Sequence, residues 1–248
     1  MERLTVNDRD GVAVVTLNNG PTNAIHPELV SQLAAVVKQV RDAAKGLILR
    51  GNEKFFSIGF DLPVLTQLDR AGMTDFWQAF NRLALELYTL PIPTISIVGG
   101  HAVGGGHILI LTSDFRYVAE GAVKKMGLNE MQLGLPVPYL ADLMIRQLAG
   151  DRVATRLMYS GDLVPLEDGK ESGLIDALIP ASELEDRAMA KIITLMKVPL
   201  AFQVIKANRT AEVKERYEAN YARQDPAFID CWFSDPVQDM LREAVKKF

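Results

Sequence analysis

The fold is decided by residues 99–112, which read Gly99-Gly100-His101-Ala102-Val103-Gly104-Gly105-Gly106-His107-Ile108-Leu109-Ile110-Leu111-Thr112. The apolar run Thr94–Val98 comes directly before this stretch and predicts a buried strand. The segment His107–Thr112 is almost wholly apolar and predicts a buried helix that starts at the glycines. Strand, glycine run and helix therefore follow one another without a break, which places unpaired backbone N–H groups at a helix N-terminus.

Three interpretations of the glycine run are open. A nucleotide-phosphate loop is disfavoured, because a Walker loop needs a lysine after its second glycine, whereas Gly105 is followed by Gly106 and His107. The dinucleotide spacing Gly-x-Gly-x-x-Gly is not matched either. Close packing of a helix on a strand also uses glycine, although three in a row are more than packing usually requires. The third interpretation is half of an oxyanion hole, in which N–H groups stabilise a developing negative charge.

Outward from this stretch, the first half of the chain alternates strands with helices. The spacing of apolar residues predicts a helix that starts near Pro27 and ends by Lys45. We expect Thr74 to cap a second helix, which ends at Pro91. The alternation predicts an α/β architecture with largely parallel strands. The expected strands are Val12–Leu17, Gly46–Arg50, Thr94–Val98 and Phe115–Ala119.

From Pro138 onward we expect helices and no strands. The sequence Ser182-Glu183-Leu184-Glu185 has the capping-box pattern of a helix start. The composition shifts near residue 190, where an α/β core gives way to a helical tail. The expected helices are Tyr139–Ala149, Asp151–Ser160, one from Ser182 to about Lys197, Pro199–Tyr221 and Val237–Lys247.

Composition and charge narrow the class of protein. The chain has 248 residues, 48% of them apolar, and a formal net charge of −4, which suits one substantial core and gives no bulk attraction to nucleic acid. The single cysteine, Cys231, cannot form an internal disulfide, so we expect a cytoplasmic protein. No apolar run approaches the roughly 20 residues of a membrane span. Met1–Leu4 does not start a signal peptide, and Lys246-Lys247-Phe248 is no peroxisomal address.

A second motif identifies a resemblance. Lys54-Phe55-Phe56-Ser57-Ile58-Gly59-Phe60-Asp61-Leu62 resembles the first oxyanion loop of the crotonase superfamily of enoyl-CoA hydratases and isomerases, and the glycine run resembles its second loop. Asp114 matches the usual aspartate, and Pro21-Thr22-Asn23-Ala24 looks like the early Asn-Ala motif. The resemblance covers essentially the whole chain. It implies an α/β fold with a crotonase-like ββα spiral core over residues 1–190, a C-terminal helical trimerisation or lid region over residues 191–248, and a homotrimer or hexamer.

The resemblance implies that the oxyanion hole consists of the backbone N–H groups of Phe60 and Gly105. The carbonyl of an acyl-CoA thioester becomes an enolate oxygen when its α-carbon loses a proton, and preorganised donors stabilise that charge. Coenzyme A is part of such a substrate, so no separate cofactor is expected, and the sequence contains no metal-binding motif. The residues expected to contact the substrate are Lys54, Ser57, Gly59, Asp61, Trp77, Gly104, Gly106 and Leu135.

Hydratases of this superfamily use two glutamates, and this chain matches one of them. Ile108 occupies the position of the first and cannot transfer protons, whereas Glu130 matches the second. The segment Gly127–Leu133 closely resembles mitochondrial-type Δ3,Δ2-enoyl-CoA isomerases, which keep this single glutamate. A 1,3 proton shift needs one mobile base, whereas addition of water needs two groups. We therefore predict that Glu130 acts first as base and then as acid in an enoyl-CoA isomerase of fatty-acid β-oxidation.

Glu130 could instead be a solvated surface carboxylate, as most glutamates are. Its neighbours Leu128, Met131 and Leu133 are apolar, however, which favours burial and a raised pKa.

Other functions stay open. The same enolate serves hydratases, thioesterases and decarboxylases, and a noncatalytic member would bind acyl-CoA or act as an assembly partner. Ile108 argues against ordinary hydration, and Glu130 argues weakly against a noncatalytic role. RNA binding, known for one branch of the superfamily, finds little support in the net negative charge.

Several further residues have two interpretations. Trp77 and its helical neighbours could line an acyl pocket or form a stripe of the core. Lys54 could contact a phosphate or an adenine, or could be solvated. We expect His101 and His107 to pack or to form hydrogen bonds rather than to catalyse, and Asp61 to fix its loop.

Overall fold

Two β-sheets form the centre of the molecule, and the computed structural model describes residues 2–121 and 123–246 of the chain. The strands are β1 (Leu4–Arg9), β2 (Val12–Leu17), β3 (Gly46–Arg50), β4 (Phe55–Ser57), β5 (Thr94–Val98), β6 (His101–Val103), β7 (Phe115–Ala119), β8 (Lys125–Gly127), β9 (Val164–Pro165) and β10 (Ala177–Ile179). The larger sheet has the order β1-β2-β3-β5-β7-β10, and the smaller has the order β4-β6-β8-β9.

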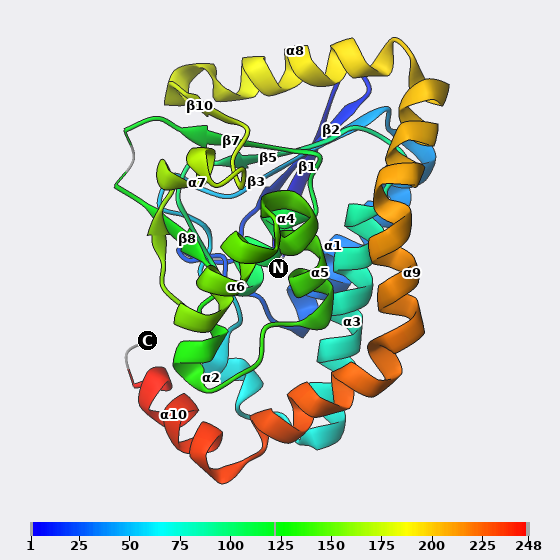
Figure 1. Ribbon diagram of the computed structural model, residues 1–248. Coiled ribbons are helices and arrows are strands. Elements are labelled where there is room, and N and C mark those ends of the chain that lie inside the picture. Colours follow the sequence, from blue (N-terminus) through cyan, green and yellow to red (C-terminus); the bar gives the residue numbers. More distant parts are fainter. Residues whose placement is uncertain (1, 122, 247–248) are drawn as a thin grey trace.

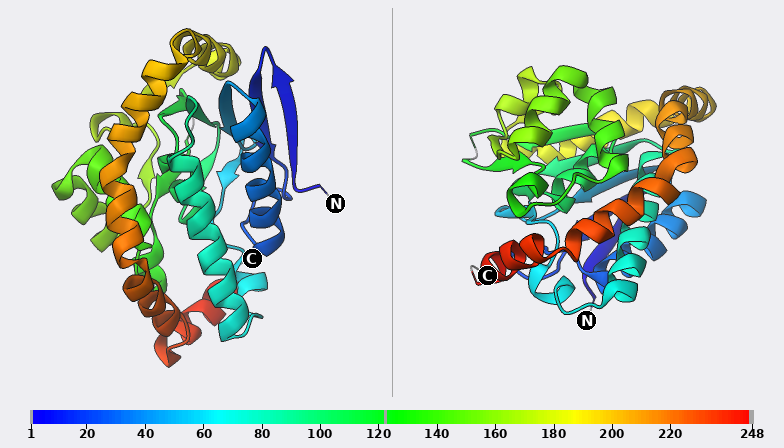
Figure 2. Two further views of the ribbon diagram at one scale, coloured as in Figure 1. Left: turned by 90° about the vertical axis from the view of Figure 1, so that its right-hand side faces the viewer. Right: turned by 60° about the horizontal axis from the view of Figure 1, so that its bottom comes forward.

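Helices surround the sheets on several sides (Figures 1 and 2). They are α1 (Pro27–Ala43), α2 (Leu62–Leu65), α3 (Arg70–Tyr88), α4 (Gly105–Leu111), α5 (Tyr139–Ala149), α6 (Asp151–Ser160), α7 (Asp168–Glu171), α8 (Leu184–Met196), α9 (Pro199–Trp232) and α10 (Asp235–Val245), with 3-10 turns η1 (Glu130–Leu133) and η2 (Ala181–Glu183).

The chain winds so that each turn adds one strand to each sheet. Strand β3 of the large sheet is followed by β4 of the small sheet, β5 by β6, and β7 by β8, with α3 and α4 as the returning helices. The pairs β2–β3, β3–β5, β5–β7 and β7–β10 are parallel, as are β4–β6 and β6–β8. This is the ββα spiral that the resemblance implies, and the prediction of largely parallel strands is confirmed.

The central strands β2, β3 and β5 of the large sheet are buried on both faces, which explains their largely apolar sequences, whereas the edge strand β1 is mostly exposed. On one face, α8 packs on the sheet, and a Cβ added to Gly46 of β3 would lie 2.3 Å from Ile192 of α8. Helix α8 spans the top of Figure 1, above the sheet. The opposite face meets the main core, to which α1, α3, α4, α5 and α9 contribute. Residue 190, the expected end of the core domain, lies inside α8.

A buried ion pair attaches α9 to the large sheet. The Lys206 ammonium, which is 3% exposed, donates to a carboxylate oxygen of Asp114 at 2.7 Å and to the carbonyl oxygen of Ile92 at 3.0 Å. The same Asp114 oxygen accepts the backbone N–H of Thr94 at 2.9 Å, and Arg209 pairs with the other oxygen at 3.2 Å. Asp114, the residue that matches the superfamily aspartate, therefore joins β5, the end of α4 and the C-terminal helix.

Helix α9 then runs down one side of the molecule, and α10 turns back beneath the core (Figure 1). Pro226 lies inside α9 and cannot donate a backbone hydrogen bond to the carbonyl of Ala222. Beyond it, α10 contacts α2 and η1, so that the end of the chain covers the turn that carries Glu130.

The absence of strands after Pro138 was a wrong prediction. Strand β10 pairs in parallel with β7 and completes the large sheet, and β9 pairs antiparallel with β8. Both strands are three residues or shorter, which is too short for a periodic pattern to show in the sequence.

Several predicted helix ends also differ, among them the start of α10, which is Asp235 rather than Val237. Helix α3 begins at Arg70 rather than Thr74, because the Asp69 carboxylate caps it by accepting the N–H of Gly72 at 2.8 Å. The capping-box pattern at Ser182 forms the turn η2 instead, and α8 begins after it without a side-chain cap. Helix α9 continues past Tyr221 to Trp232, because a proline interrupts one hydrogen bond but does not end a helix that is packed along its length.

Within the described part of the chain, no single helix is long and apolar enough to cross a membrane. The segments Ala181–Met196 and Pro199–Trp232 reach that length and composition only together, with a bend of 101° between them. The prediction that the C-terminus is no peroxisomal address involves Lys247 and Phe248, and these two residues lie outside the described residues.

Candidate active site

Three neighbouring strands of the small sheet end at one place. In the order β4-β6-β8, the chain leaves them toward Gly59-Phe60, Gly104-Gly105 and Asn129-Glu130 respectively. The strands are parallel, so their carboxyl ends share one edge of the sheet. The N–H of Gly104 donates to the carbonyl of Gly127 at 2.8 Å, which extends the β6–β8 ladder to the site. The spiral therefore assembles three predicted segments that are about 70 positions apart from first to last in the sequence.

Ser57 fixes the first loop from inside the protein. Its hydroxyl is fully buried, donates to the carbonyl of Asn23 at 2.7 Å and accepts the N–H of Gly59 at 3.0 Å. The Asn23 amide in turn donates to the carbonyls of Phe55 and Phe56 at 3.2 Å. The early Asn-Ala motif and the first loop are thus one hydrogen-bonded unit, and Ser57 supports the loop rather than facing the cavity.

The peptide of Phe60 is held on both sides by Ile25. The N–H of Ile25 donates to the carbonyl of Gly59 at 2.7 Å, and the N–H of Asp61 donates to the carbonyl of Ile25 at 2.9 Å. The Asp61 carboxylate accepts the N–H of Val64 at 3.2 Å and caps α2. The expected loop-fixing role of Asp61 agrees with this geometry. The N–H of Phe60, between these two bonds, stays available.

The glycine run needs to be glycine because the first loop packs against it. A Cβ on Gly106 would lie 2.5 Å from the carbonyl oxygen of Ser57, and one on Gly105 would lie 2.9 Å from the ring of Phe60. Gly59 adopts φ +96° and Gly104 adopts φ +51°, which is the left-handed region that favours glycine. A Cβ on Gly59 would come within 3.3 Å of the backbone nitrogen of Gly105. The two loops therefore touch at the two expected donors.

The two expected donors, the N–H groups of Phe60 and Gly105, have no acceptor among the residues that the structure describes. Both residues line the same cavity. Buried backbone N–H groups are almost always paired, so two adjacent free donors facing a cavity are suited to bind an oxygen atom of a ligand.

Glu130 lies beside these donors and is 7% exposed. Its Oε2 has no hydrogen-bond partner among the described residues, and its Oε1 is 3.5 Å from the point where a Cβ of Gly104 would lie. Burial raises the pKa of Glu130 from 4.5 to about 7, because the carboxylate loses its hydration without gaining a cation. The raised pKa expected from its apolar neighbours is therefore found, and the side chain can exchange a proton near neutral pH.

The cavity that these groups share has a volume of about 250 Å³ and a largely apolar wall. The C-terminal helices close it, with Phe228 and Trp232 from α9 and Ala244 from α10. Electrostatic interactions are stronger beside an apolar wall of this kind than in water. The complete lining is Ile58, Gly59, Phe60, Leu62, Val103, Gly104, Gly105, Asn129, Glu130, Leu133, Leu135, Phe228, Trp232 and Ala244.

The other predicted contact residues lie at different places. Lys54 is exposed at the start of β4, and Trp77 is buried in α3, where it stacks on Phe228 with ring centroids 3.4 Å apart. Neither lines the cavity, whereas Leu135 does. Ile108 is buried in the core below the glycines and does not reach the cavity. The cavity wall therefore has no second carboxylate among the described residues.

The two histidines beside the glycines are held by packing. His107 is fully buried, and burial lowers its pKa to about 3, so the ring is neutral at physiological pH. The Nδ1 atom of His101 accepts the N–H of Lys125 at 3.1 Å, and its ring packs on Phe55. Neither lines the cavity. In the part of the chain that the structure describes, no group of three His, Cys, Asp or Glu side chains could hold a metal ion.

Sequence reasoning missed the wall that the C-terminal helices supply. Phe228 and Trp232 are four residues apart and so share one helix face, which is a signal of burial that the sequence does contain. The helix was expected to end at Tyr221, so this face was not recognised. Asn129, which lines the cavity and whose Oδ1 lies 3.2 Å from the point where a Cβ on Gly104 would lie, was also missed.

The sequence of this chain is similar to those of known enoyl-CoA enzymes. The sequence model of a protein family described as enoyl-CoA hydratase/isomerase matches residues 7–246. The human protein named enoyl-CoA delta isomerase 1, mitochondrial, is 27% identical over 236 residues, which cover 94% of this chain and 78% of the human protein. A Thermus thermophilus protein named putative enoyl-CoA hydratase is 29% identical over 189 residues, which cover 74% of each chain.

A solved structure described as human mitochondrial delta3-delta2-enoyl-CoA isomerase superposes with a TM-score of 0.94 at 26% identity. The match covers 99% of this chain and 98% of the human chain. The expected fold class and the resemblance to mitochondrial-type isomerases are thereby confirmed.

Proposed function

The chain belongs to the enoyl-CoA hydratase/isomerase family, and on that premise we propose that it is a Δ3,Δ2-enoyl-CoA isomerase, which moves a double bond from C3 to C2 of a fatty enoyl-CoA. The observation that carries this proposal is the single buried carboxyl of Glu130 beside two free backbone donors. With a pKa of about 7, the Glu130 carboxyl is about half ionised at neutral pH, so it can both accept and donate a proton.

In the first step, ionised Glu130 removes a proton from C2 of a 3-enoyl thioester. The electrons of the broken C–H bond form a C1–C2 double bond, and the carbonyl π electrons move onto the oxygen. The N–H groups of Phe60 and Gly105 donate to this oxyanion, and each such donor is worth roughly 3–4 kcal/mol in an enclosed site. The negative charge therefore passes from a buried carboxylate, whose Oε2 has no hydrogen-bond partner among the described residues, to an oxygen that has two donors.

In the second step, protonated Glu130 returns the proton to C4 of the dienolate. The C3–C4 double bond supplies the electrons for the new C–H bond, the double bond settles between C2 and C3, and the carbonyl is restored. Protons and charge balance without water, because Glu130 returns to C4 the proton that it removed from C2. No separate cofactor takes part, since coenzyme A is part of the substrate. The Oε2 atom of Glu130 has no hydrogen-bond partner among the described residues, so this oxygen is free to take up the proton at C2 and to return it at C4.

Hydration is the second candidate, because the identity to a protein named as a hydratase is similar to the identity to a named isomerase. Water addition needs one group to activate water and another to deliver a proton. Ile108 stands at the position of the first of the two hydratase glutamates and is packed in the core, and the cavity wall is largely apolar. These features favour the isomerase.

Two substrates separate the candidates. Ultraviolet spectroscopy can follow conversion of 3-hexenoyl-CoA to 2-hexenoyl-CoA and, in a parallel sample, hydration of crotonyl-CoA. We expect rapid isomerisation and slow hydration. Hydration of crotonyl-CoA at a rate comparable to isomerisation would support the hydratase, and turnover of neither substrate would support a noncatalytic or different acyl-CoA function.

The remaining parts of the proposal concern contacts and assembly. Gly59, Gly104 and Leu135 would shape the place of the acyl group, Gly106 would act by letting the first loop pack against the glycine run, and exposed Lys54 would meet the coenzyme A phosphates. A homotrimer or hexamer, a cytoplasmic location and a role in fatty-acid β-oxidation are part of the same proposal. Size-exclusion chromatography with light scattering tests the assembly.

A further inference from the structure

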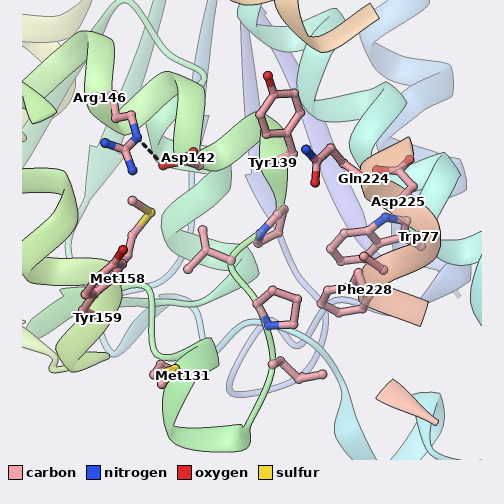
Figure 3. Close-up of a pocket in the computed structure, with 15 residues that line it drawn as sticks. Trp77, Met131, Tyr139, Asp142, Arg146, Met158, Tyr159, Gln224, Asp225 and Phe228 are labelled. Atoms are coloured by element: carbon pink, nitrogen blue, oxygen red, sulfur yellow. Dashed lines mark hydrogen bonds and ion pairs between the residues drawn. The ribbon is translucent and has the colours of Figure 1, made fainter. Parts of the chain in front are cut away.

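A second and larger pocket lies next to the catalytic cavity. Its volume is about 420 Å³, and it lies between α3, η1, α5, α6 and the C-terminal part of α9. Figure 3 shows Trp77, Gln224, Asp225 and Phe228 on one side of this pocket and Arg146, Asp142, Met158 and Tyr159 on the other. The loop that follows η1 runs between the two sides. The proposed reaction uses none of this space.

Leu135 and Phe228 belong to both compartments. They are the two residues that line the catalytic cavity as well as the second pocket. Leu135 is 4% exposed and Phe228 is 2% exposed, so their side chains fill the space between the compartments instead of standing at a surface. They therefore form a wall of two side chains, which we call the partition.

The catalytic turn itself positions one half of the partition. The N–H of Leu135 donates to the carbonyl of Glu130 at 3.0 Å, and Gly134, at φ +71°, makes the tight bend between them. Two prolines, Pro136 and Pro138, then fix the direction of the loop along the second pocket. The backbone of Leu135 is consequently fixed to that of Glu130, the proton-transferring group, in the same cavity wall.

The other half comes from α9 and is backed by α3. Phe228 stacks on Trp77 with ring centroids 3.4 Å apart and an angle of 13° between the rings. Trp77 lines the second pocket but not the catalytic cavity. Because the Phe228 ring is stacked on the Trp77 indole, Phe228 can change its rotamer only if Trp77 moves as well. Phe228 is therefore the stiffer of the two partition residues.

The chemistry of the second pocket suits a hydrocarbon chain. The loop between the two sides contributes apolar side chains, Met131, Met158 and Phe228 add apolar surface around it, and Gln224 and Asp225 are polar residues at one side. The one cation that lines it among the described residues is Arg146, and two carboxylates neutralise it: Asp142 at 2.6 Å, marked in Figure 3, and Asp151. No free positive charge is therefore left for a phosphate, whereas an apolar chain loses nothing by entering.

We infer that Leu135 and Phe228 set the acyl-chain length of the substrate, and that the second pocket receives the methyl end of chains that reach past them. This inference rests on the proposed function, since it takes the acyl group of an enoyl-CoA as the occupant. With the thioester oxygen at Phe60 and Gly105 and C2 to C4 at Glu130, the rest of the acyl chain points toward Leu135 and Phe228. Short chains end at the partition, and longer chains displace it.

The test compares chain lengths in matched variants. The ratio of kcat/KM for 3-tetradecenoyl-CoA to that for 3-hexenoyl-CoA is measured in the wild type and in Leu135→Ala. Each methylene moved from water to apolar surroundings is worth roughly fourfold in binding. Because the smaller side chain opens the way to the second pocket, we expect the ratio to rise at least about tenfold in Leu135→Ala.

Leu133→Ala is the matched control. Leu133 lies on the same turn and lines the catalytic cavity, but it does not line the second pocket. We expect its ratio to stay near that of the wild type, even where both rates fall. Phe228→Leu is a milder change on the other half of the partition and should raise the ratio in the same direction, which covers the case that Leu135→Ala does not fold.

A binding measurement separates this inference from the proposed function. Calorimetry with the unreactive thioesters hexanoyl-CoA and tetradecanoyl-CoA gives the same ratio without chemistry. A ratio that rises in Leu135→Ala and not in Leu133→Ala supports the partition, even if no isomerisation is seen. Isomerisation with the same length ratio in all four proteins overturns the partition and leaves the proposed function standing. Failure of all proteins to bind any acyl-CoA overturns both.

Discussion

Replacing Glu130 by glutamine should stabilise the protein above neutral pH. The carboxyl is buried in an apolar wall and its Oε2 has no partner among the described residues, so ionisation in the folded state is opposed by lost hydration. Glutamine has nearly the same shape and does not ionise. The substitution should therefore remove the unfavourable free energy of ionising a buried carboxyl, which destabilises the folded wild type above neutral pH.

The magnitude follows from the pKa of Glu130 in the two states. Its pKa is about 7 in the folded protein against 4.5 when exposed, and at about 1.36 kcal/mol per pH unit this step amounts to about 3 kcal/mol. Between these values the folded state binds more protons than the unfolded state, so stability falls as pH rises. The contribution of protonated Glu130 is complete below pH 4.5 and is lost as pH rises through about 7.

Urea unfolding of wild type and Glu130→Gln, at one protein concentration and at several pH values between 5 and 8, measures this difference. The free energy of unfolding of the variant relative to the wild type should increase by about 2.5 kcal/mol from pH 5 to pH 8, because a small part of the full difference is already present at pH 5. Other ionisable groups cancel, because both proteins share them. A difference that stays constant with pH would refute the reasoning, since it would mean that Glu130 does not titrate near neutrality in the folded protein.

Three other substitutions test the parts around Glu130. In Gly105→Ala the new Cβ would press on the Phe60 ring at 2.9 Å and shift the second donor, so kcat should fall roughly 10²–10³-fold in the isomerase assay while the fold is retained on circular dichroism. Ser57→Ala removes the bonds to Asn23 and Gly59, and we expect about 1–3 kcal/mol of lost stability in urea unfolding; an unchanged midpoint would show that the hydroxyl does not hold the loop. Lys206→Met leaves the buried Asp114 carboxylate with a partly exposed arginine, and thermal and urea unfolding should show a loss of about 3 kcal/mol; a neutral result would contradict the anchoring of α9.

The sequence was most informative where strands are buried on both faces. The predicted strands Val12–Leu17, Gly46–Arg50, Thr94–Val98 and Phe115–Ala119 have the observed bounds, because burial on both faces demands an unbroken apolar run that is bounded by turn residues. Helices Tyr139–Ala149 and Asp151–Ser160 also have the observed bounds, since Gly150 and Gly161 end them in backbone conformations that favour glycine.

Short strands and helix starts could not be predicted in the same way. The strands of the small sheet are two or three residues long, and pairing with distant neighbours defines them, not a local pattern. The start of α3 depends on which of two capping residues, Asp69 or Thr74, meets the first free N–H groups, and both are acceptable in sequence.

In the candidate site, too, the residues in local motifs could be predicted, and the residues that long-range packing brings together could not. The residues on its two loops and Glu130 were predicted from motifs, and the structure brings Phe60, Gly105 and Glu130 to one cavity. The apolar wall from Phe228 and Trp232 lies about 100 residues further along the chain, and only long-range packing places it there. The same holds for the second pocket, whose two sides come from helices far apart in sequence.

The rate of 3-hexenoyl-CoA isomerisation by Glu130→Gln tests most directly the claim that one buried carboxyl shuttles the proton between C2 and C4. The variant keeps the two backbone donors and the apolar wall, so it should still bind a saturated acyl-CoA with wild-type affinity. A proton-transfer group contributes roughly 10²–10⁴-fold, and the account predicts that kcat falls by at least about 10²-fold. Conversion at the wild-type rate would contradict the account, because the proton would then have to travel through another group.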